Sequence, residues 1–166
     1  LSAFMQNTQL VIFENEHRQL TEVCEKLLRD SMASAIFLVD KIGQLVTSCG
    51  QTGSIDTTSL ASLVAGATAA TGGLAGLLGE EEFPAHYHQG DRASLYIALI
   101  GSELILAVIF DNRSTEGLVR LRVKRAGAEL DAIFSQMNEK ADSEQPANLF
   151  GEITDEDIEN LFSDTF

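Results

Sequence analysis

The chain has 166 residues, which is the size of one ordinary domain, and 45% of them are hydrophobic, as in a globular protein. It carries 25 Asp and Glu against 11 Lys and Arg, a formal net charge of -14 that repels phosphate backbones and anionic membrane surfaces. We therefore expect no nucleic-acid partner. We also expect no membrane insertion and a cytoplasmic location, because we recognise no apolar run close to the roughly 20 residues that cross a bilayer.

The charge distribution divides the chain. Eight acidic residues follow Lys140 and no basic residue does, and the border is polar and contains one of the two prolines. We place the folded domain at 10–140 and expect an acidic linker with an amphipathic C-terminal helix at 141–166. Residues 1–9 form an N-terminal extension, of which 1–4 precede a methionine and are expected to be an expression remnant.

The first predicted elements are a helix and a hairpin. Apolar residues recur at spacings of three and four over 17–30, which predicts one face of a helix. Two short β-rich runs follow at 35–40 and 44–48, and the turn residues Lys41 to Gly43 separate them. This pattern predicts a β-hairpin.

A second helix, three strands and a third helix complete the predicted domain. Asp56 or Thr57 can cap the second helix, and Gly79 suits the left-handed residue at its C-terminal end. The predicted strands are 83–88, 94–100 and 104–110, and the last helix opens at Ser114 or Thr115. The order αββαβββα predicts an α+β fold in which helices cover both faces of a five-stranded antiparallel sheet.

Sequence motifs for catalysis are not found. There is no GxxxxGK[ST] phosphate loop and no GxSxG elbow, so we expect no catalytic residue and no cofactor of the chain's own. His86 and His88 alternate on one strand, a spacing that two zinc ligands can use, but no third ligand accompanies them and one paired and one exposed histidine is the simpler interpretation. Cys24 and Cys49 lack metal-like spacing and are expected to be reduced thiols.

The second helix has an unusual composition. A helical wheel places a core face on Leu60, Leu63, Val64, Ala67, Thr71, Leu74 and Leu78. The opposite face carries almost only small residues, and we predict that it is a docking face: Ser62, Ala65, Ala69, Gly72, Gly73 and Gly76. The glycines within this helix cost about 3 to 4 kcal/mol in total relative to alanine. The alternatives are that both faces are buried in one protomer or that the segment is a loop.

The C-terminal segment combines acidic and apolar residues. Thr154, followed by three acidic residues, is typical of a helix N-terminus. Ile158, Leu161 and Phe162 then fall on one side, as in a helix that binds a groove. The alternative is a solubilising tail whose apolar residues fold back on the same domain.

Four segments carry a family resemblance: FLVDKIGQLVTSCGQ, IDTTSLASLVAGATAATGGLAGLLGEEEFP, VIFDNRSTEGLVRLRVKRA and FGEITDEDIENLFSD. With the element order, they resemble the Roadblock domain family, and within it the MglB-like regulators of the small GTPase MglA. The resemblance implies a homodimer in which the sheets join and the second helices lie side by side as a platform for one GTPase. Ala67 departs from it, because close relatives are expected to carry Asn there.

The resemblance also implies an activity. MglB-like proteins stimulate GTP hydrolysis by repositioning the GTPase's own catalytic residues, and they regulate cell polarity and motility, so enrichment at a cell pole is expected. The GTPase, not the chain, would hold GTP and Mg²⁺. The C-terminal helix would contact the GTPase through Ile158, Leu161 and Phe162. Arg113 is an alternative trans arginine finger, and a Roadblock-type adaptor that leaves GTP turnover unchanged is the alternative function.

Overall fold

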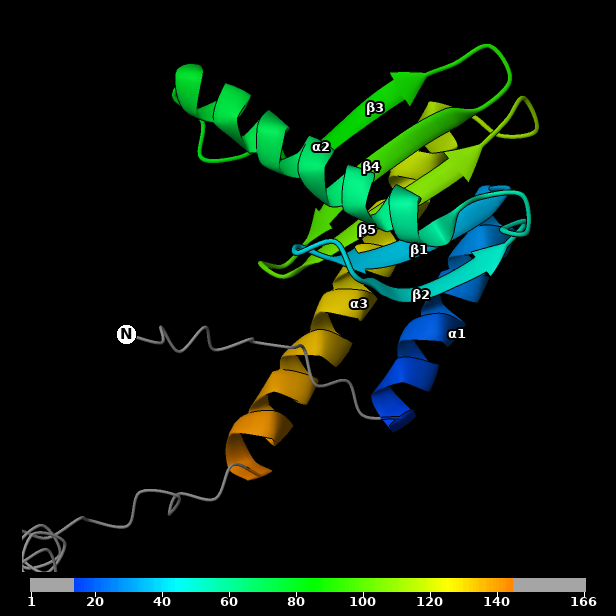
Figure 1. The fold of residues 1–166 in the computed structure, drawn as a ribbon. Coiled ribbons are helices and arrows are strands. Elements are labelled where there is room, and N and C mark those ends of the chain that lie inside the picture. Colours follow the sequence, from blue (N-terminus) through cyan, green and yellow to red (C-terminus); the bar gives the residue numbers. More distant parts are fainter. Residues whose placement is uncertain (1–13, 145–166) are drawn as a thin grey trace, which may run out of the picture.

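The computed structural model describes residues 14–144 of the chain (Figure 1). Its elements are α1 (Glu14–Ser31), β1 (Ala35–Asp40), β2 (Leu45–Gly50), α2 (Thr57–Leu77), β3 (Ala85–Gln89), β4 (Ser94–Ile100), β5 (Leu104–Phe110) and α3 (Glu116–Glu144). The predicted order of helices and strands is confirmed. The helix α3 continues past Lys140, where we placed the end of the domain, and ends at Glu144. Ile158, Leu161 and Phe162, the predicted contacts of the C-terminal helix, lie outside the described residues.

All strands belong to one antiparallel sheet with the order β2-β1-β5-β4-β3. The strand β1 lies between β2, its hairpin partner, and β5, which comes from the second half of the chain. The sheet therefore joins the two halves of the sequence through β1 and β5.

The sheet separates two hydrophobic clusters. Ile36 and Leu38 of β1 face α1 and α3, which lie side by side on one face of the sheet (Figure 1). Phe37 and Val39 face α2, which covers the other face alone (Figure 1). This alternation is the period of two expected for a strand that is buried on both faces. The predicted α+β fold with helices on both faces is confirmed.

Two cysteines lie in the described domain and both are free thiols. Burial raises the pKa of Cys24 to about 12 and that of Cys49 to about 11. Both thiols therefore favour the protonated state at neutral pH.

The end of β2 depends on a glycine. Gly50 has a φ of +88°, and a Cβ atom added to it would lie 2.4 Å from the carbonyl oxygen of Ser34. Ser34 also accepts a hydrogen bond from the backbone N–H of Gln51 at 2.8 Å, so this oxygen is held in place. Only glycine fits this conformation without a backbone shift.

We predict that Gly50→Ala lowers the free energy of unfolding by about 1 to 3 kcal/mol, since it adds both a positive-φ penalty and a backbone clash. Urea unfolding followed by circular dichroism measures this change. Gly53→Ala is the matched control, because a Cβ atom there meets no atom of residues 14–144 within 4 Å, and it is expected to stay within about 0.5 kcal/mol of the parent. Equal effects of the two changes would contradict this account.

Candidate functional site: the outward face of helix α2

The helix α2 is fixed at both ends by local hydrogen bonds. Asp56 is its N-cap, and its Oδ1 accepts a hydrogen bond from the backbone N–H of Ser59 at 3.1 Å. This backbone hydrogen bond lowers the pKa of Asp56 below its usual value. At the other end the N–H of Glu80 donates to the carbonyl of Ala75 at 2.9 Å, and Gly79 has a φ of +77° as predicted. The sequence thus determines where α2 begins and ends.

The helix α2 packs on its sheet through small residues. Ala61, Val64 and Ala65 are buried in the cluster that contains Phe37 and Val39 of β1. The Cα atom of Ser62 lies 3.2 Å from the ideal Cβ position of Gly43, so the helix also approaches the β1–β2 turn closely. Alanines on the inner side of α2 allow this approach because the sheet supplies the larger side chains.

The predicted core face of α2 is rotated by roughly a quarter of a helical turn from the observed one. Val64 is buried and Leu60 packs against the same cluster, as predicted, but other members of the face are exposed. Leu63, Leu74 and Leu78 were expected in the core, but their exposed fractions are 72%, 58% and 73%. Ala65 was expected on the docking face, but it is 8% exposed and packs against its own sheet. The wheel assigned the core to the leucines, whereas packing against large sheet residues favours the alanines.

The other predicted docking residues lie on or near the exposed side of the helix. Ser62, Ala69, Gly73 and Gly76 are exposed, and Gly72 is half-buried. Among the described residues, a Cβ atom at Gly72, Gly73 or Gly76 would meet no atom within 4 Å, so packing within 14–144 does not require these glycines. We call the exposed side the outward face of α2, and its residues are Ser62, Leu63, Gly66, Ala69, Ala70, Gly73, Leu74, Gly76 and Leu77.

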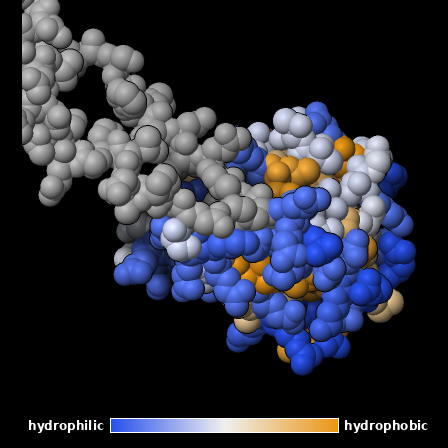
Figure 2. Space-filling model, turned by 90° about the horizontal axis from the view of Figure 1, so that it is seen from below, coloured by the Kyte–Doolittle hydropathy of each residue, from blue (hydrophilic) through white to orange (hydrophobic). Residues whose placement is uncertain are grey.

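The outward face is apolar and contains no charge, since α2 has no Asp, Glu, Lys or Arg. Three exposed acids, Glu80, Glu81 and Glu82, follow directly after the helix. Seen from the end of the molecule away from α2, the described surface is largely hydrophilic and its hydrophobic areas are separate (Figure 2). A continuous apolar surface on a folded domain is typical of an interaction site.

The expectation that no apolar run is close to the length that crosses a bilayer is wrong. Within the described residues, Thr57–Leu77 has the length and composition of a membrane-crossing helix, and only 22% of its most apolar stretch is buried in the domain. We missed this run because alanine, glycine and threonine interrupt its leucines. The same helix packs on β1, β2 and β5 of its own domain (Figure 1).

The side chain of Arg113 is held by hydrogen bonds to two residues of its own domain. Its Nε donates to Oδ1 of Asp111 at 3.0 Å, and its Nη2 donates to Oγ of Ser34 at 3.3 Å. The hydrogen bond from the Arg113 side chain lowers the pKa of Asp111. An arginine finger would have to break these contacts before it could reach a partner.

His86 and His88 form a pair on the edge strand β3. Nδ1 of His86 lies 3.1 Å from Nε2 of His88, and the rings meet edge to face with centroids 5.3 Å apart. Burial, followed by the neighbouring His88, lowers the pKa of His86, so the His86 ring favours the neutral state. Because His86 is half-buried and His88 is exposed, this arrangement matches the simpler of the two sequence interpretations.

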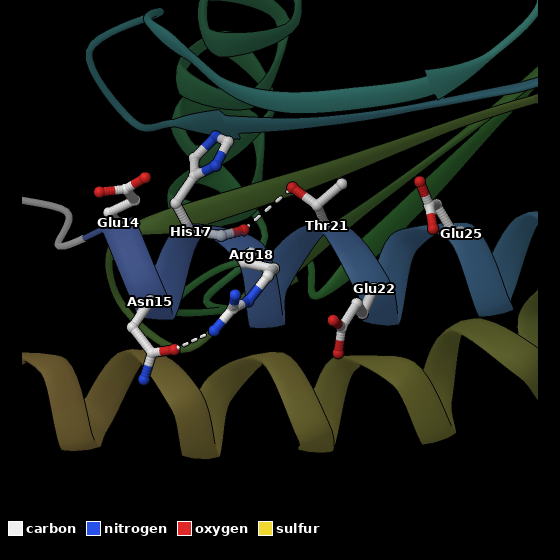
Figure 3. A pocket seen from close by; sticks show the side chains of 7 residues that line it. All are labelled: Glu14, Asn15, His17, Arg18, Thr21, Glu22 and Glu25. Atoms are coloured by element: carbon white, nitrogen blue, oxygen red, sulfur yellow. Dashed lines mark hydrogen bonds between the residues drawn. The ribbon is translucent and has the colours of Figure 1, made fainter.

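The described residues contain no cluster of metal ligands: no group of three or more His, Cys, Asp or Glu residues that could hold a metal ion occurs within 14–144. A surface cavity of about 770 Å³ is lined by α1 alone, and its side chains point to different sides of the helix (Figure 3). Side chains that diverge from one helix do not form a catalytic centre. The outward face of α2 therefore remains the candidate site.

Comparisons with known proteins identify the fold. The Roadblock/LC7 domain family matches residues 19–110. Myxococcus xanthus MglB is 55% identical, with a TM-score of 0.73, over 77% of this chain and 96% of that chain. The gliding protein MglB from Thermus thermophilus is 34% identical, with a TM-score of 0.72, over 77% of this chain and 97% of that chain.

A further structure, described as MglB with tetrameric arrangement, is 33% identical, with a TM-score of 0.74, over 78% of this chain and 97% of that chain. A comparison with curated proteins gives no significant match. The family match spans more than half of the chain, and the MglB structures agree with it in sequence and in fold. The chain therefore belongs to the Roadblock/LC7 domain family, and within that family to the MglB-like proteins.

Proposed function

We propose that this chain acts as a homodimer that binds a small Ras-like GTPase of the MglA type and stimulates its GTP hydrolysis. The observation that carries the proposal is the outward face of α2, an exposed apolar surface in a chain that resembles MglB over most of its length. The chain would contribute no catalytic residue and no cofactor, because GTP and Mg²⁺ would be bound by the GTPase. By the same likeness, the protein would act in the cytoplasm, enriched at a cell pole, in polarity and motility.

The outward face of α2 suits the pairing of two copies. Leu63, Leu74 and Leu77 are exposed in the single chain, and complete burial of a leucine side chain stabilises an interface by about 1.5 to 3 kcal/mol. The glycines and alanines between these leucines let a second backbone approach closely. Two helices side by side would then form a platform broader than one domain offers.

The composition of this platform favours activation without an inserted residue. The helix α2 has no charged side chain, so it has no arginine or lysine to insert beside the transferred phosphate. It can instead hold the switch segments of the GTPase in a conformation that aligns the GTPase's own residues. The acids Glu80, Glu81 and Glu82 at the end of α2 favour a partner surface with positive charge there.

We predict that the double change Ala69→Arg, Gly73→Arg abolishes stimulation, because two long cationic side chains on the outward face prevent close approach. Single-turnover GTP hydrolysis by the cognate GTPase, with this protein in excess, is expected to fall at least tenfold. The matched control is Ala132→Arg, Gln136→Arg, which places the same charges at the same spacing on exposed positions of α3. GTPase binding without stimulation by the unmodified protein would instead establish the adaptor function.

We predict that Leu77→Asp weakens self-association at least tenfold, because Leu77 is 83% exposed in the single chain and would lie between two copies. Light scattering across a concentration series measures this effect. Leu121→Asp on α3 is the control, since Leu121 is also exposed, at 62%. Unchanged association of Leu77→Asp would show that the copies meet elsewhere. A higher assembly, as in the tetrameric MglB relative, would appear in the same measurement.

We predict that Arg113→Ala leaves the stimulated hydrolysis rate within about twofold of the parent, because Arg113 is occupied by Asp111 and Ser34. A trans arginine finger contributes roughly 10³ to 10⁵ in rate. A loss of a hundredfold or more with GTPase binding preserved would therefore overturn the proposed mechanism.

A further inference from the structure

A groove lies on the opposite face of the sheet from α2, between β4 and the first half of α3. Its volume is about 430 Å³. The floor includes apolar groups of both elements: Tyr96, Ala98, Ile100, Val123, Gly127 and Ala128. At Gly127 an added Cβ atom would lie 3.0 Å from Cδ1 of Ile100, so the helix lies close to the sheet at this point.

Positive charge lines one side of this groove. Arg120 and Lys124 border it on α3, and Asp131 lies further along the same helix. Arg120 forms an ion pair with Glu116, whereas the structure shows no ion pair for Lys124 within 14–144. The two belong to a basic run that holds five of the chain's 11 Lys and Arg: Arg113, Arg120, Arg122, Lys124 and Arg125. In a chain with a net charge of -14, this clustering of basic side chains favours an acidic ligand.

The chain itself contains a segment with matching chemistry. Residues 145–166, outside the described structure, carry six acids and no base. Ile158, Leu161 and Phe162 recur there at helical spacing, with Asp157 and Glu159 between and beside them. The segment therefore offers apolar groups for the floor and carboxylates for Arg120 and Lys124.

The connecting chain is long enough for this contact within one molecule. From Lys124 to Glu144 the helix α3 rises roughly 30 Å, at about 1.5 Å per residue. The chain from Glu144 to Ile158 spans at most about 50 Å when extended, at about 3.3 to 3.6 Å per residue. The segment can therefore return along α3 to the groove without being fully extended.

We propose that residues 155–163 dock into the α3/β4 groove of their own chain, with Ile158, Leu161 and Phe162 on the floor and the acids beside Arg120 and Lys124. The docked segment lies on the face opposite to α2, so it leaves the outward face of α2 uncovered. Any contact of the same segment with a partner protein must first displace it from the groove. The domain would thus compete with any partner protein for binding of its own C-terminal segment.

Paramagnetic relaxation in the full-length protein tests the proposal. A spin label is attached at Ala132→Cys, an exposed position of α3 outside the groove lining, in a Cys49→Ala background. The buried Cys24, whose pKa is raised to about 12, stays unlabelled. We expect broadened amide signals for Ile158, Leu161 and Phe162, and recovery of the Ile158 and Phe162 signals in Leu161→Asp.

Two neighbouring charge reversals locate the binding site. Lys124→Glu is expected to lower the ratio of docked to free segment about two- to fivefold, as for loss of an exposed ion pair. Arg125→Glu makes the same charge change but does not line the groove, and it is expected to leave the ratio unchanged. Equal effects of the two variants, or no broadening in the parent, would overturn the proposal.

A mixed sample distinguishes docking within one chain from docking between chains. Isotope-labelled chains without the spin label are combined with spin-labelled chains that carry no isotope. No broadening is expected in this mixture. Broadening there that equals the effect within one chain would overturn the intramolecular assignment and place the segment on a second copy.

Discussion

Burial of the strand β1 on both faces is the constraint on which the rest of the fold depends. All six of its residues are buried, and alternate side chains contact α1 and α3 on one side and α2 on the other. Because β1 also pairs with β2 and β5, every layer of the domain meets at this strand. The position of α2, and with it the candidate interaction surface, follows from how Phe37 and Val39 are covered.

The helix α2 packs on the sheet with one side and exposes the other side to solvent. Large side chains of the sheet meet small side chains of the helix, so Ala61 and Ala65 take the inner positions. The leucines that a soluble helix would normally bury then lie outside, at Leu63, Leu74 and Leu77. A contiguous apolar face of this kind is typical of an interaction surface, which is why we associate it with a second copy and a GTPase.

The two faces of the sheet suit different partners. The α2 side is uncharged and apolar, followed by acids at the end of the helix, and we assign it to association with other proteins. The α3 side combines an apolar groove with the densest basic run of an acidic chain, and we assign it to the chain's own C-terminal segment. This separation would let the segment remain bound to its domain without competing for the platform.

The sequence by itself determined the element order, the start of α2 at Asp56 or Thr57, the left-handed Gly79 after its end and the unusual composition of this helix, because these depend on local periodicity and turn chemistry. It did not determine which side of α2 meets the sheet. A wheel ranks faces by hydrophobicity, and Leu63 and Leu74 outrank Ala61 and Ala65 on that scale. Only the tertiary structure decided the orientation, because the space left above Phe37 and Val39 admits alanine and leaves the leucines outside.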